Sequence, residues 1–230
     1  MEIKFLKKHG IRACENSVWD FKVCDKRFGF KYPGRLPGQI YANFFYYFSN
    51  KNDTILDLFA GSGTSIDVGK LMNRNVIGYD LNPSRKDIIQ FDILKDTNDF
   101  PKNYFQAIFC DPPYYNMNYK LYSNKKTDLA NLDLYNFVKS MKLIDIKFNR
   151  SIKKNGYFAI IISNKRQYGK LVDLEFKINE IFSKRLTLVH KIIVPYYNTK
   201  YQKLWNENHF IINKFLLIGH RTLFVFQKRY

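Results

Sequence analysis

A chain of 230 residues is long enough to bury a full hydrophobic core as one domain, and its 46% of hydrophobic residues argues against wholesale disorder. Lys and Arg number 38 against 20 acidic residues, so the formal net charge is +18, which favours a polyanionic partner, most simply nucleic acid. The alternative is a general compositional bias, because Asn, Ile, Phe and Tyr are abundant as well.

Several classes of protein are disfavoured by the same composition. Cys14, Cys24 and Cys110 form no CxxC pair, which argues against a zinc site or a disulfide framework and fits a reducing cytosol. The four histidines are scattered, so we expect no metal. No apolar run approaches the roughly 20 residues that span a bilayer, and the first eight residues are too charged for a signal peptide. We therefore expect a cytoplasmic protein with no membrane partner.

The first half of the chain alternates between helix and strand patterns. Residues 1–32 are basic and irregular, and a turn-rich segment at 32–38 precedes a helix at 39–48 with an aromatic face. The pattern then predicts a strand at 54–58, a helix at 65–73, a strand at 75–79 and a short element at 83–89.

The second half continues this alternation. We expect strands at 107–110, 157–162, 186–194 and 216–226, and helices at 132–152 and 173–183. Strands that alternate with helices indicate a doubly wound α/β fold with a mainly parallel sheet. The chain is predicted to be a single domain over 1–230, with a lead-in at 1–32 and a small insertion at 195–214.

A glycine-containing turn separates the first strand from its helix. Gly61 and Gly63 let the backbone approach a ligand closely, and the helix start offers free N–H groups. Ile66 stands where the dinucleotide fingerprint needs glycine, and no Gly-Lys-Ser/Thr follows, so this is not a phosphate loop. Asp57 at the strand end favours a ligand with a cationic amino group.

Two further acids follow in chain order. Asp80 ends the next strand, at the sheet edge where open α/β folds bind ligands, and an acid there commonly binds ribose hydroxyls. Asp92 lies between Phe91 and Ile93, which suits an adenine ring and its amine. Each acid alone also fits a helix cap or a solvated turn, but together they indicate S-adenosylmethionine (SAM).

The most informative stretch is Asp111-Pro112-Pro113-Tyr114, directly after the apolar run 107–110. The prolines stiffen the turn and expose its carbonyl groups. A carboxylate, an exposed carbonyl and an aromatic ring suit a flat base that carries an amino group. Alone, the tetrapeptide would also fit an ordinary polar turn.

These segments resemble the DNA amino-methyltransferases that act on adenine N6 or cytosine N4. The resemblance covers about residues 17–163 and implies a Rossmann-like SAM-dependent methyltransferase fold with an antiparallel last strand. It implies that Asp111, Pro112, Pro113 and Tyr114 are catalytic. The residues it implies for SAM binding are Pro37, Asp57, Phe59, Ala60, Gly61, Gly63, Thr64, Asp80, Leu81, Asp92 and Ile93.

Two basic, aromatic stretches are candidates for contact with nucleic acid, because Lys neutralises phosphates and aromatic rings stack on bases. They contain Tyr115, Tyr119, Lys120, Tyr122, Lys125 and Lys126 after the catalytic turn, and Tyr197, Lys200 and Lys203 before the last strand. The alternative is a solvated loop held by core aromatics. We favour function for the first stretch and leave the second open.

We therefore expect a site-specific DNA methyltransferase that acts on a flipped base, with adenine N6 preferred because the resemblance associates Asp at the first position of the turn with adenine. Cytosine N4 of DNA, guanine N2 of RNA and a non-catalytic nucleic-acid-binding module are the alternatives. No separate recognition domain is evident. The recognition sequence is then short or loosely defined, or specificity is supplied by a second copy of the chain or by another partner. Whether a restriction enzyme accompanies the protein is left open.

Overall fold

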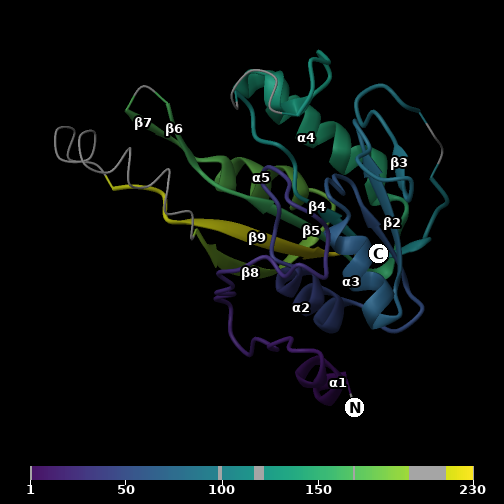
Figure 1. The fold of residues 1–230 in the computed structure, drawn as a ribbon. Helices are drawn as coiled ribbons and strands as arrows, with labels where there is room; N and C mark the ends of the chain where they lie inside the picture. Colours follow the sequence, from purple (N-terminus) through teal and green to yellow (C-terminus); the bar gives the residue numbers. More distant parts are fainter. Residues whose placement is uncertain (1, 98–99, 117–121, 168, 197–215, 230) are drawn as a thin grey trace.

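The computed structural model describes residues 2–97, 100–116, 122–167, 169–196 and 216–229. A seven-stranded sheet in the order β3-β2-β1-β4-β5-β9-β8 crosses its centre (Figure 1). The strands are β1 (Thr54–Asp57), β2 (Asn75–Asp80), β3 (Ile88–Gln90), β4 (Phe105–Cys110), β5 (Ile152–Ile162), β8 (Thr187–Pro195) and β9 (His220–Gln227). From β3 to β5 all pairs are parallel, and β9 is antiparallel to β5 and β8, which confirms the predicted fold class.

Helices cover both faces of the sheet (Figure 1). They are α1 (Glu2–Lys8), α2 (Gly38–Phe48), α3 (Thr64–Met72), α4 (Leu134–Asn149) and α5 (Leu174–Phe182). The pair α2 and α3 lies on one face, and the pair α4 and α5 on the other. Both faces are covered, so the central strands are apolar on both sides, as expected for a parallel sheet.

Strand β4 shows how its sequence divides between the two cores. Ile108 and Cys110 pack on the side of α4 and α5, whereas Ala107 and Phe109 pack on the side of α2, because successive side chains of a strand point to opposite faces. The Phe109 ring lies 4.7 Å from Tyr41 and 5.2 Å from Phe44, both on α2. The aromatic face predicted for this helix is therefore core packing.

Acidic residues set the start of two helices. Asp133 accepts a hydrogen bond from the Asn136 backbone at the start of α4, at 2.8 Å, and Asp173 caps the start of α5 through Phe176, at 2.9 Å. Such caps satisfy backbone donors that have no partner within the helix. The helix expected at 132–152 is shorter in the structure: α4 begins after Asp133 and ends at Asn149, and Ile152 is the first residue of β5.

The structure contains elements that were not predicted. The lead-in expected to be irregular begins with α1, and Trp19 N donates to Ile193 O of β8 at 2.9 Å. A small hairpin of β6 (Lys165–Gln167) and β7 (Lys170–Val172) lies apart from the main sheet. Its strands are too short and polar to show a strand pattern. Most of the insertion at 195–214 lies outside the described residues.

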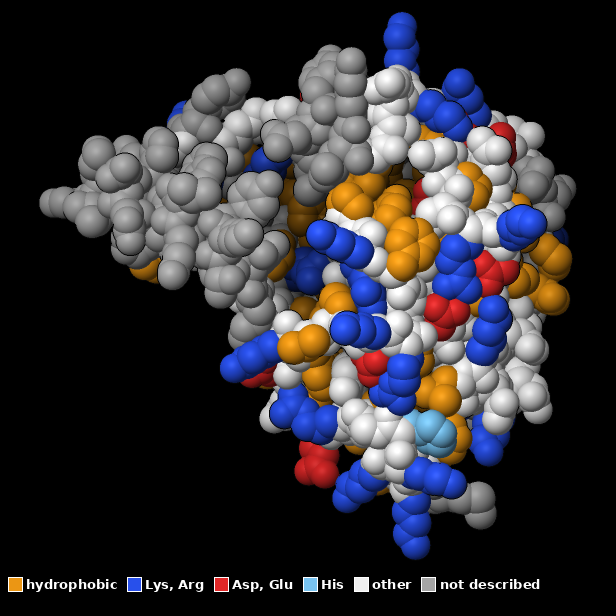
Figure 2. All heavy atoms as spheres, viewed as in Figure 1, with side chains coloured by type: hydrophobic (Ala, Val, Ile, Leu, Met, Phe, Trp, Pro, Cys, Tyr) orange, Lys and Arg blue, Asp and Glu red, His pale blue; other side chains and the backbone are white. Residues whose placement is uncertain are grey.

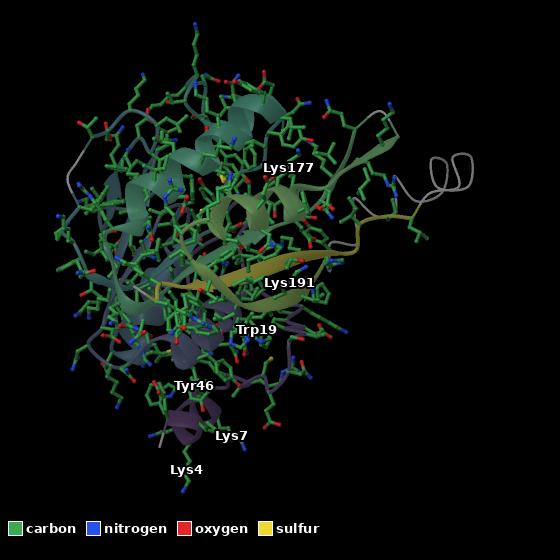
Figure 3. All side chains as sticks on the ribbon, turned by 180° about the vertical axis from the view of Figure 1, so that it is seen from behind. Lys4, Lys7, Trp19, Tyr46, Lys177 and Lys191 are labelled. Carbon is green, nitrogen blue, oxygen red and sulfur yellow. The ribbon has the colours of Figure 1, made fainter. Side chains whose placement is uncertain are left out.

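The positive charge is not confined to one face. Lys and Arg side chains are spread over the face seen in Figure 2, with fewer acidic groups between them. In the view from behind, Lys4 and Lys7 lie together on α1, whereas Lys177 of α5 and Lys191 of β8 lie well away from them (Figure 3). Charge alone therefore does not locate a binding surface. Among the described helices, none is long and apolar enough to cross a membrane.

The contact between α3 and β2 yields a stability prediction. A Cβ at Gly69 would lie 2.3 Å from Val76 Cγ2, so Gly69→Ala must push the helix off the strand. Such overpacking costs about 1–3 kcal/mol and outweighs the gain in helix propensity of about 1 kcal/mol. We expect the free energy of unfolding in urea to fall by roughly 1 kcal/mol or more.

Gly219→Ala is the matched control, because nothing lies within 4 Å of its Cβ position and its φ is not in the left-handed region. We expect this variant to stay within about 0.5 kcal/mol of the wild type. Equal effects of the two substitutions would contradict the close approach of α3 and β2.

Candidate active site

A cavity of about 720 Å³ opens at the carboxyl edge of the parallel strands, a volume typical of small-molecule sites. Segments far apart in the chain form its wall. They include residues 32–36, 58–62, 80–82, 91–93, 111–114, 122–123 and 127–129, with single residues such as Thr64, Lys165, Tyr196 and Arg221.

Strand order explains why these segments meet. β1 lies between β2 and β4 and is parallel to both, so the three carboxyl ends share one edge of the sheet. The glycine loop follows β1, Asp80 ends β2, and Asp111 follows β4. A ligand at this edge can contact all three, which is the usual position of sites in open α/β sheets.

The two loop glycines serve different contacts. Both have positive φ, 50° at Gly61 and 77° at Gly63, where other residues would be strained. The Gly61 N–H donates to Asp80 Oδ2 at 2.9 Å, and a Cβ there would lie 3.2 Å from the Tyr32 ring. Gly63 does not line the cavity; a Cβ there would lie 2.5 Å from Arg85 Nη1. Gly61 therefore belongs to the wall, and Gly63 makes room for Arg85 behind the loop.

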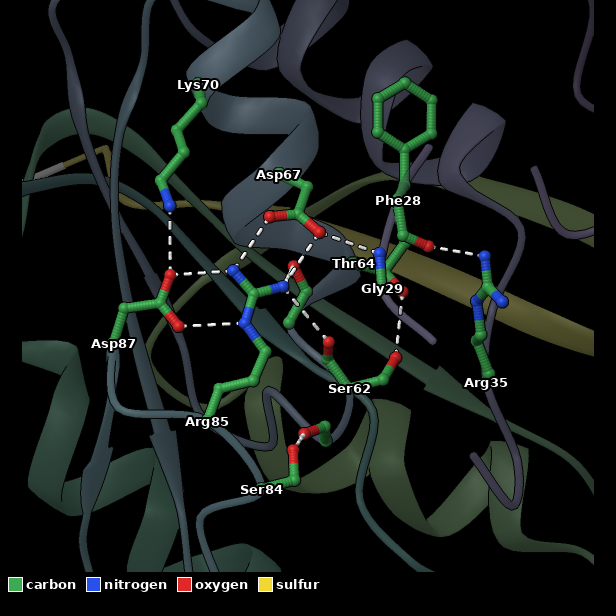
Figure 4. A network of polar contacts seen from close by, with 12 residues as sticks. Phe28, Gly29, Arg35, Ser62, Thr64, Asp67, Lys70, Ser84, Arg85 and Asp87 are labelled. Carbon is green, nitrogen blue, oxygen red and sulfur yellow. Dashed lines mark hydrogen bonds and ion pairs between the residues drawn. The ribbon is translucent and has the colours of Figure 1, made fainter. Parts of the chain in front are cut away.

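Arg85 holds the loop from outside (Figure 4). Its guanidinium donates two hydrogen bonds to Asp67 of α3, both at 2.8 Å, and two to Asp87, at 2.8 and 2.7 Å. It also reaches the Ser62 carbonyl at 3.3 Å. Asp67 Oδ2 accepts a further bond from Gly29 N at 2.7 Å, so the lead-in is attached to the same carboxylate.

Asp80 and Asp92 both lie on the cavity wall, with Leu81 and Ile93 beside them. Asp80 Oδ1 accepts from Asn82 N at 2.9 Å, in addition to the bond from Gly61, and burial raises the pKa of this carboxyl group. Asp92 Oδ2 accepts from the Thr127 hydroxyl at 2.7 Å. Both carboxylates are fixed in position before any ligand arrives.

Besides Gly63, two residues expected to bind the cofactor do not line the cavity. Asp57 is fully buried beneath the loop, where its Oδ1 accepts from Phe59 N at 3.1 Å, and burial raises its pKa to about 7. This differs from the expected direct contact with an amino group, because the strand still points the side chain into the protein at this position. Pro37 caps α2, whereas residues 33–36 before it form the wall. Phe59, Ala60 and Thr64 do line the cavity.

The turn Asp111-Pro112-Pro113-Tyr114 lines the cavity with all four residues. Burial raises the pKa of Asp111 to about 6, and the positive charge of Arg221 offsets part of this rise. Burial likewise raises the pKa of Tyr114, so its phenol stays protonated. The turn thus presents a carboxylate with a raised pKa and a neutral aromatic ring to the same space as the glycine loop.

The residues predicted to contact nucleic acid fall into three groups: some lie at the cavity or are exposed, one is buried in the core, and the others lie outside the described residues. Tyr122 lines the cavity 6.2 Å from the Tyr32 ring, Lys125 Nζ donates to Leu81 O at 3.0 Å, and Lys126 is exposed. Tyr115 is instead in the core, 1% exposed and 5.8 Å from Phe137, because the chain turns there and directs the ring towards α4. Tyr119, Lys120, Tyr197, Lys200 and Lys203 lie outside the described residues.

Several side chains of this wall were not predicted as site residues, among them Arg221, Tyr196 and Lys165. Arg221 and Tyr196 come from β9 and from the end of β8, and Lys165 Nζ ties down the exit of the turn by donating to the carbonyls of Tyr115 and Asn116, at 2.9 and 2.8 Å. An antiparallel last strand begins at the carboxyl edge of its parallel neighbours, so the predicted topology held a signal for Arg221. Within the described residues no group of three or more His, Cys, Asp or Glu forms a candidate metal site.

Comparison with a family model identifies the N-terminal part of the chain. Residues 6–91 match the DNA methylase family. The match covers the lead-in, the glycine loop, Asp80 and β3, and it ends before the turn at 111–114. It confirms the resemblance to the N6/N4 amino-methyltransferases of DNA and, with it, SAM as the cofactor. No curated protein matches the chain in sequence.

Two solved structures share the fold, and a third is similar over part of the chain. TrmN from Thermus thermophilus is 12% identical, with a TM-score of 0.55 over 85% of this chain and 50% of its own. A SAM-dependent methyltransferase from Methanosarcina mazei is 11% identical, with a TM-score of 0.50 over 80% of this chain and 96% of its own. A proposed DNA modification methylase, also from Thermus thermophilus, is 14% identical, with a TM-score of 0.40 over 57% of this chain. The chain spans only 47% of that last protein.

The Arg85 network predicts a change in cofactor affinity. Arg85→Met removes the cation that joins Asp67, Asp87 and the loop carbonyls, so the loop spends less time in the binding conformation. If that population falls to about a tenth, the Kd for SAM rises about tenfold. Isothermal titration calorimetry measures this change directly.

Lys70→Met is the matched control, because Lys70 is exposed and, among the residues that the structure describes, forms an ion pair with Asp87 alone, at 2.9 Å. We expect the Kd of this variant to stay within about twofold of the wild type, as for most surface ion pairs. An unchanged affinity in Arg85→Met would show that the loop does not depend on the guanidinium.

Proposed function

We propose that the chain is a DNA methyltransferase that transfers the methyl group of SAM to the exocyclic amine of a flipped-out base, with adenine N6 as the preferred target. One observation carries the proposal. The turn Asp111-Pro112-Pro113-Tyr114 lies in the same cavity as Gly61, Asp80 and Asp92. A methyl donor and a methyl acceptor could therefore meet there without a large movement of the protein.

The wall supports a division of the cavity into two ends. At one end, Gly61 N, Asp80 and Asp92 offer the backbone approach and the carboxylates that suit an amino acid, a ribose and an adenine. At the other end, Asp111, Tyr114 and Tyr196 surround a space suited to a flat base. A base in a duplex cannot reach a recessed turn, so the target must leave the helix.

The chemistry follows from the poor nucleophilicity of the amine, whose lone pair is delocalised into the ring. Asp111 and the Pro112 carbonyl accept the two N–H bonds and direct the lone pair away from the ring plane. SAM supplies an electrophilic methyl group on a sulfonium. With SAM bound, the nitrogen–carbon bond would form as the carbon–sulfur bond breaks and a neutral thioether leaves; Asp111 or water would take the proton that the nitrogen loses. Alignment and the carboxylate charge supply most of the acceleration.

The preference for adenine rests on the resemblance, in which Asp at the position of Asp111 is associated with adenine. Cytosine N4 of DNA and guanine N2 of RNA are the enzymatic alternatives, and a non-catalytic nucleic-acid-binding module is the third. Digestion of the product to nucleosides, followed by mass spectrometry, separates the enzymatic cases. Failure to bind SAM in calorimetry would favour the non-catalytic module.

The proposal extends to the whole chain. It acts as a single domain in a reducing, cytoplasmic compartment, and it modifies a specific sequence, as a methyltransferase of a restriction–modification system does. The basic surface supports a DNA partner. Specificity comes from a short site, from a second copy of the chain or from another partner. Sequencing that detects methylated bases in cells expressing the chain identifies the site.

Removing the carboxylate of the turn gives the direct test. Asp111→Ala leaves the amine without its main acceptor, so we expect kcat to fall at least about 100-fold, as when other preorganised polar groups are removed from active sites. The affinity for SAM, measured by calorimetry, should stay within about threefold, because Asp111 belongs to the base end of the cavity. Full activity in this variant would refute the assignment.

The raised pKa of Asp111 predicts an acid limb in the pH profile. Protonated Asp111 is a weaker acceptor for the N–H bond and no longer carries the negative charge that stabilises the developing positive charge on the amine, so activity requires the carboxylate and is lost as the pH falls through about 6. We expect kcat/KM to drop about tenfold per pH unit below that value. Asp111→Asn cannot titrate, so its residual activity should show no such limb; a limb unchanged in this variant would assign the titration to another group.

A further inference from the structure

Arg221 is a cation in the cavity wall that the mechanism above does not use. It is the second residue of β9, paired in register with Val194 of β8. Because β9 is antiparallel to β5, its first residues lie at the carboxyl edge, where the turn at 111–114 also lies. The register thus directs a guanidinium at the base end of the cavity.

The contacts of Arg221 leave donors available. Its guanidinium carbon lies 5.2 Å from the centre of the Tyr196 ring. Its Nε is buried and has no hydrogen-bond partner among the described residues. Within the same ranges no ion pair of 4.0 Å or less joins it to Asp111, although its charge lowers the pKa of that carboxyl group. A buried donor without a partner is costly, so a ligand atom is the natural acceptor.

The nature of the base indicates which atom that is. Arginine offers five N–H donors and no acceptor. Adenine N1 and cytosine N3 are both acceptors, and each lies next to the ring carbon that carries the reactive amine. Guanine N2 differs, since its ring carbon lies between two nitrogens: N1, which carries a hydrogen and would face the guanidinium donor to donor, and N3, which is an acceptor. In adenine and cytosine the one ring nitrogen next to that carbon is an acceptor. A carboxylate beside a guanidinium thus matches an amine beside an unprotonated ring nitrogen.

We propose that Arg221 is a specificity-determining residue that donates a hydrogen bond to the ring nitrogen next to the methylated amine, N1 of adenine or N3 of cytosine. This inference rests on the proposed function and deepens it. Asp111 accepts a hydrogen bond from the amine, and Arg221 donates one to the ring nitrogen beside it. A base with a hydrogen at that nitrogen would leave the guanidinium unpaired, and sites that lose such a bond reject the wrong ligand strongly.

A cycle that pairs one protein change with one atom of DNA tests the contact. The probes are duplex oligonucleotides with the site found by sequencing, carrying adenine or 1-deazaadenine at the target, or cytosine or 3-deazacytosine if the methylated nucleoside is cytosine. Removing the ring nitrogen also alters the amine itself, but equally for every enzyme variant. We define the penalty as the factor by which kcat/KM falls when the deaza base replaces the natural base. The informative quantity is the ratio of this penalty in the wild type to that in Arg221→Met.

We expect the penalty in the wild type to exceed that in Arg221→Met by about 10- to 100-fold, the value of a hydrogen bond from a charged group. Lys191→Met is the matched control: it removes a cation from the neighbouring strand β8, outside the cavity wall, and should keep the wild-type penalty. Calorimetry with SAM checks that the variants are folded.

Equal penalties in wild type and Arg221→Met would overturn the assignment, as would a wild type that treats both bases alike. The second comparison needs no variant, so it holds even if Arg221→Met fails to fold. The absence of any methylated nucleoside in DNA would be a different result. It would refute the proposed function, and the role of Arg221 with it.

Discussion

The parallel pairing of β1 with β2 and β4 is the constraint on which the site depends. It aligns Asp57 of β1 with Gly78 of β2 and Phe109 of β4, so the chain leaves the three strands at one level. The glycine loop, Asp80 and the turn at 111–114 meet in the cavity because of this register. A strand that slipped by one residue would reverse its side chains between the two cores, and those cores are filled on both faces of the sheet.

Hydrogen bonds then hold in place the loops that meet at the carboxyl edge of the sheet. Arg85 and Asp67 hold the glycine loop, Gly61 N holds Asp80, and Lys165 holds the exit of the turn at 111–114. Arg85 and Asp67 lie outside the cavity wall, whereas Gly61, Asp80 and Lys165 belong to it. The wall is thus held both by contacts within it and by contacts from outside, which is the arrangement that preorganisation requires.

Local sequence predicted the elements whose pattern is strong, such as α2, β1, β2 and the apolar part of β5, and the fold class followed from their alternation. It failed where a long-range contact decides the outcome. The β6–β7 hairpin is too short to show a pattern, and Tyr115 looks like its neighbours in the basic loop yet packs on Phe137. Arg221 reaches the cavity only through the direction of β9. The glycine loop and the turn at 111–114 were recognisable because the residues of each are consecutive in the sequence. The residues that form the rest of the cavity wall come from separate segments of the chain.

The lead-in connects parts of the fold that are otherwise distant. Trp19 N and Ser17 O form hydrogen bonds with the backbone of Ile193 at the far edge of the sheet. Gly29 N donates to Asp67 beside the glycine loop, and the Tyr32 ring covers Gly61. A fragment that starts at residue 38 would keep both glycines, all the acids and the turn, but would lack one wall of the cavity. The smallest unit able to retain a cofactor is thus larger than the span of its recognisable motifs, which matters for anyone who trims or fuses this chain.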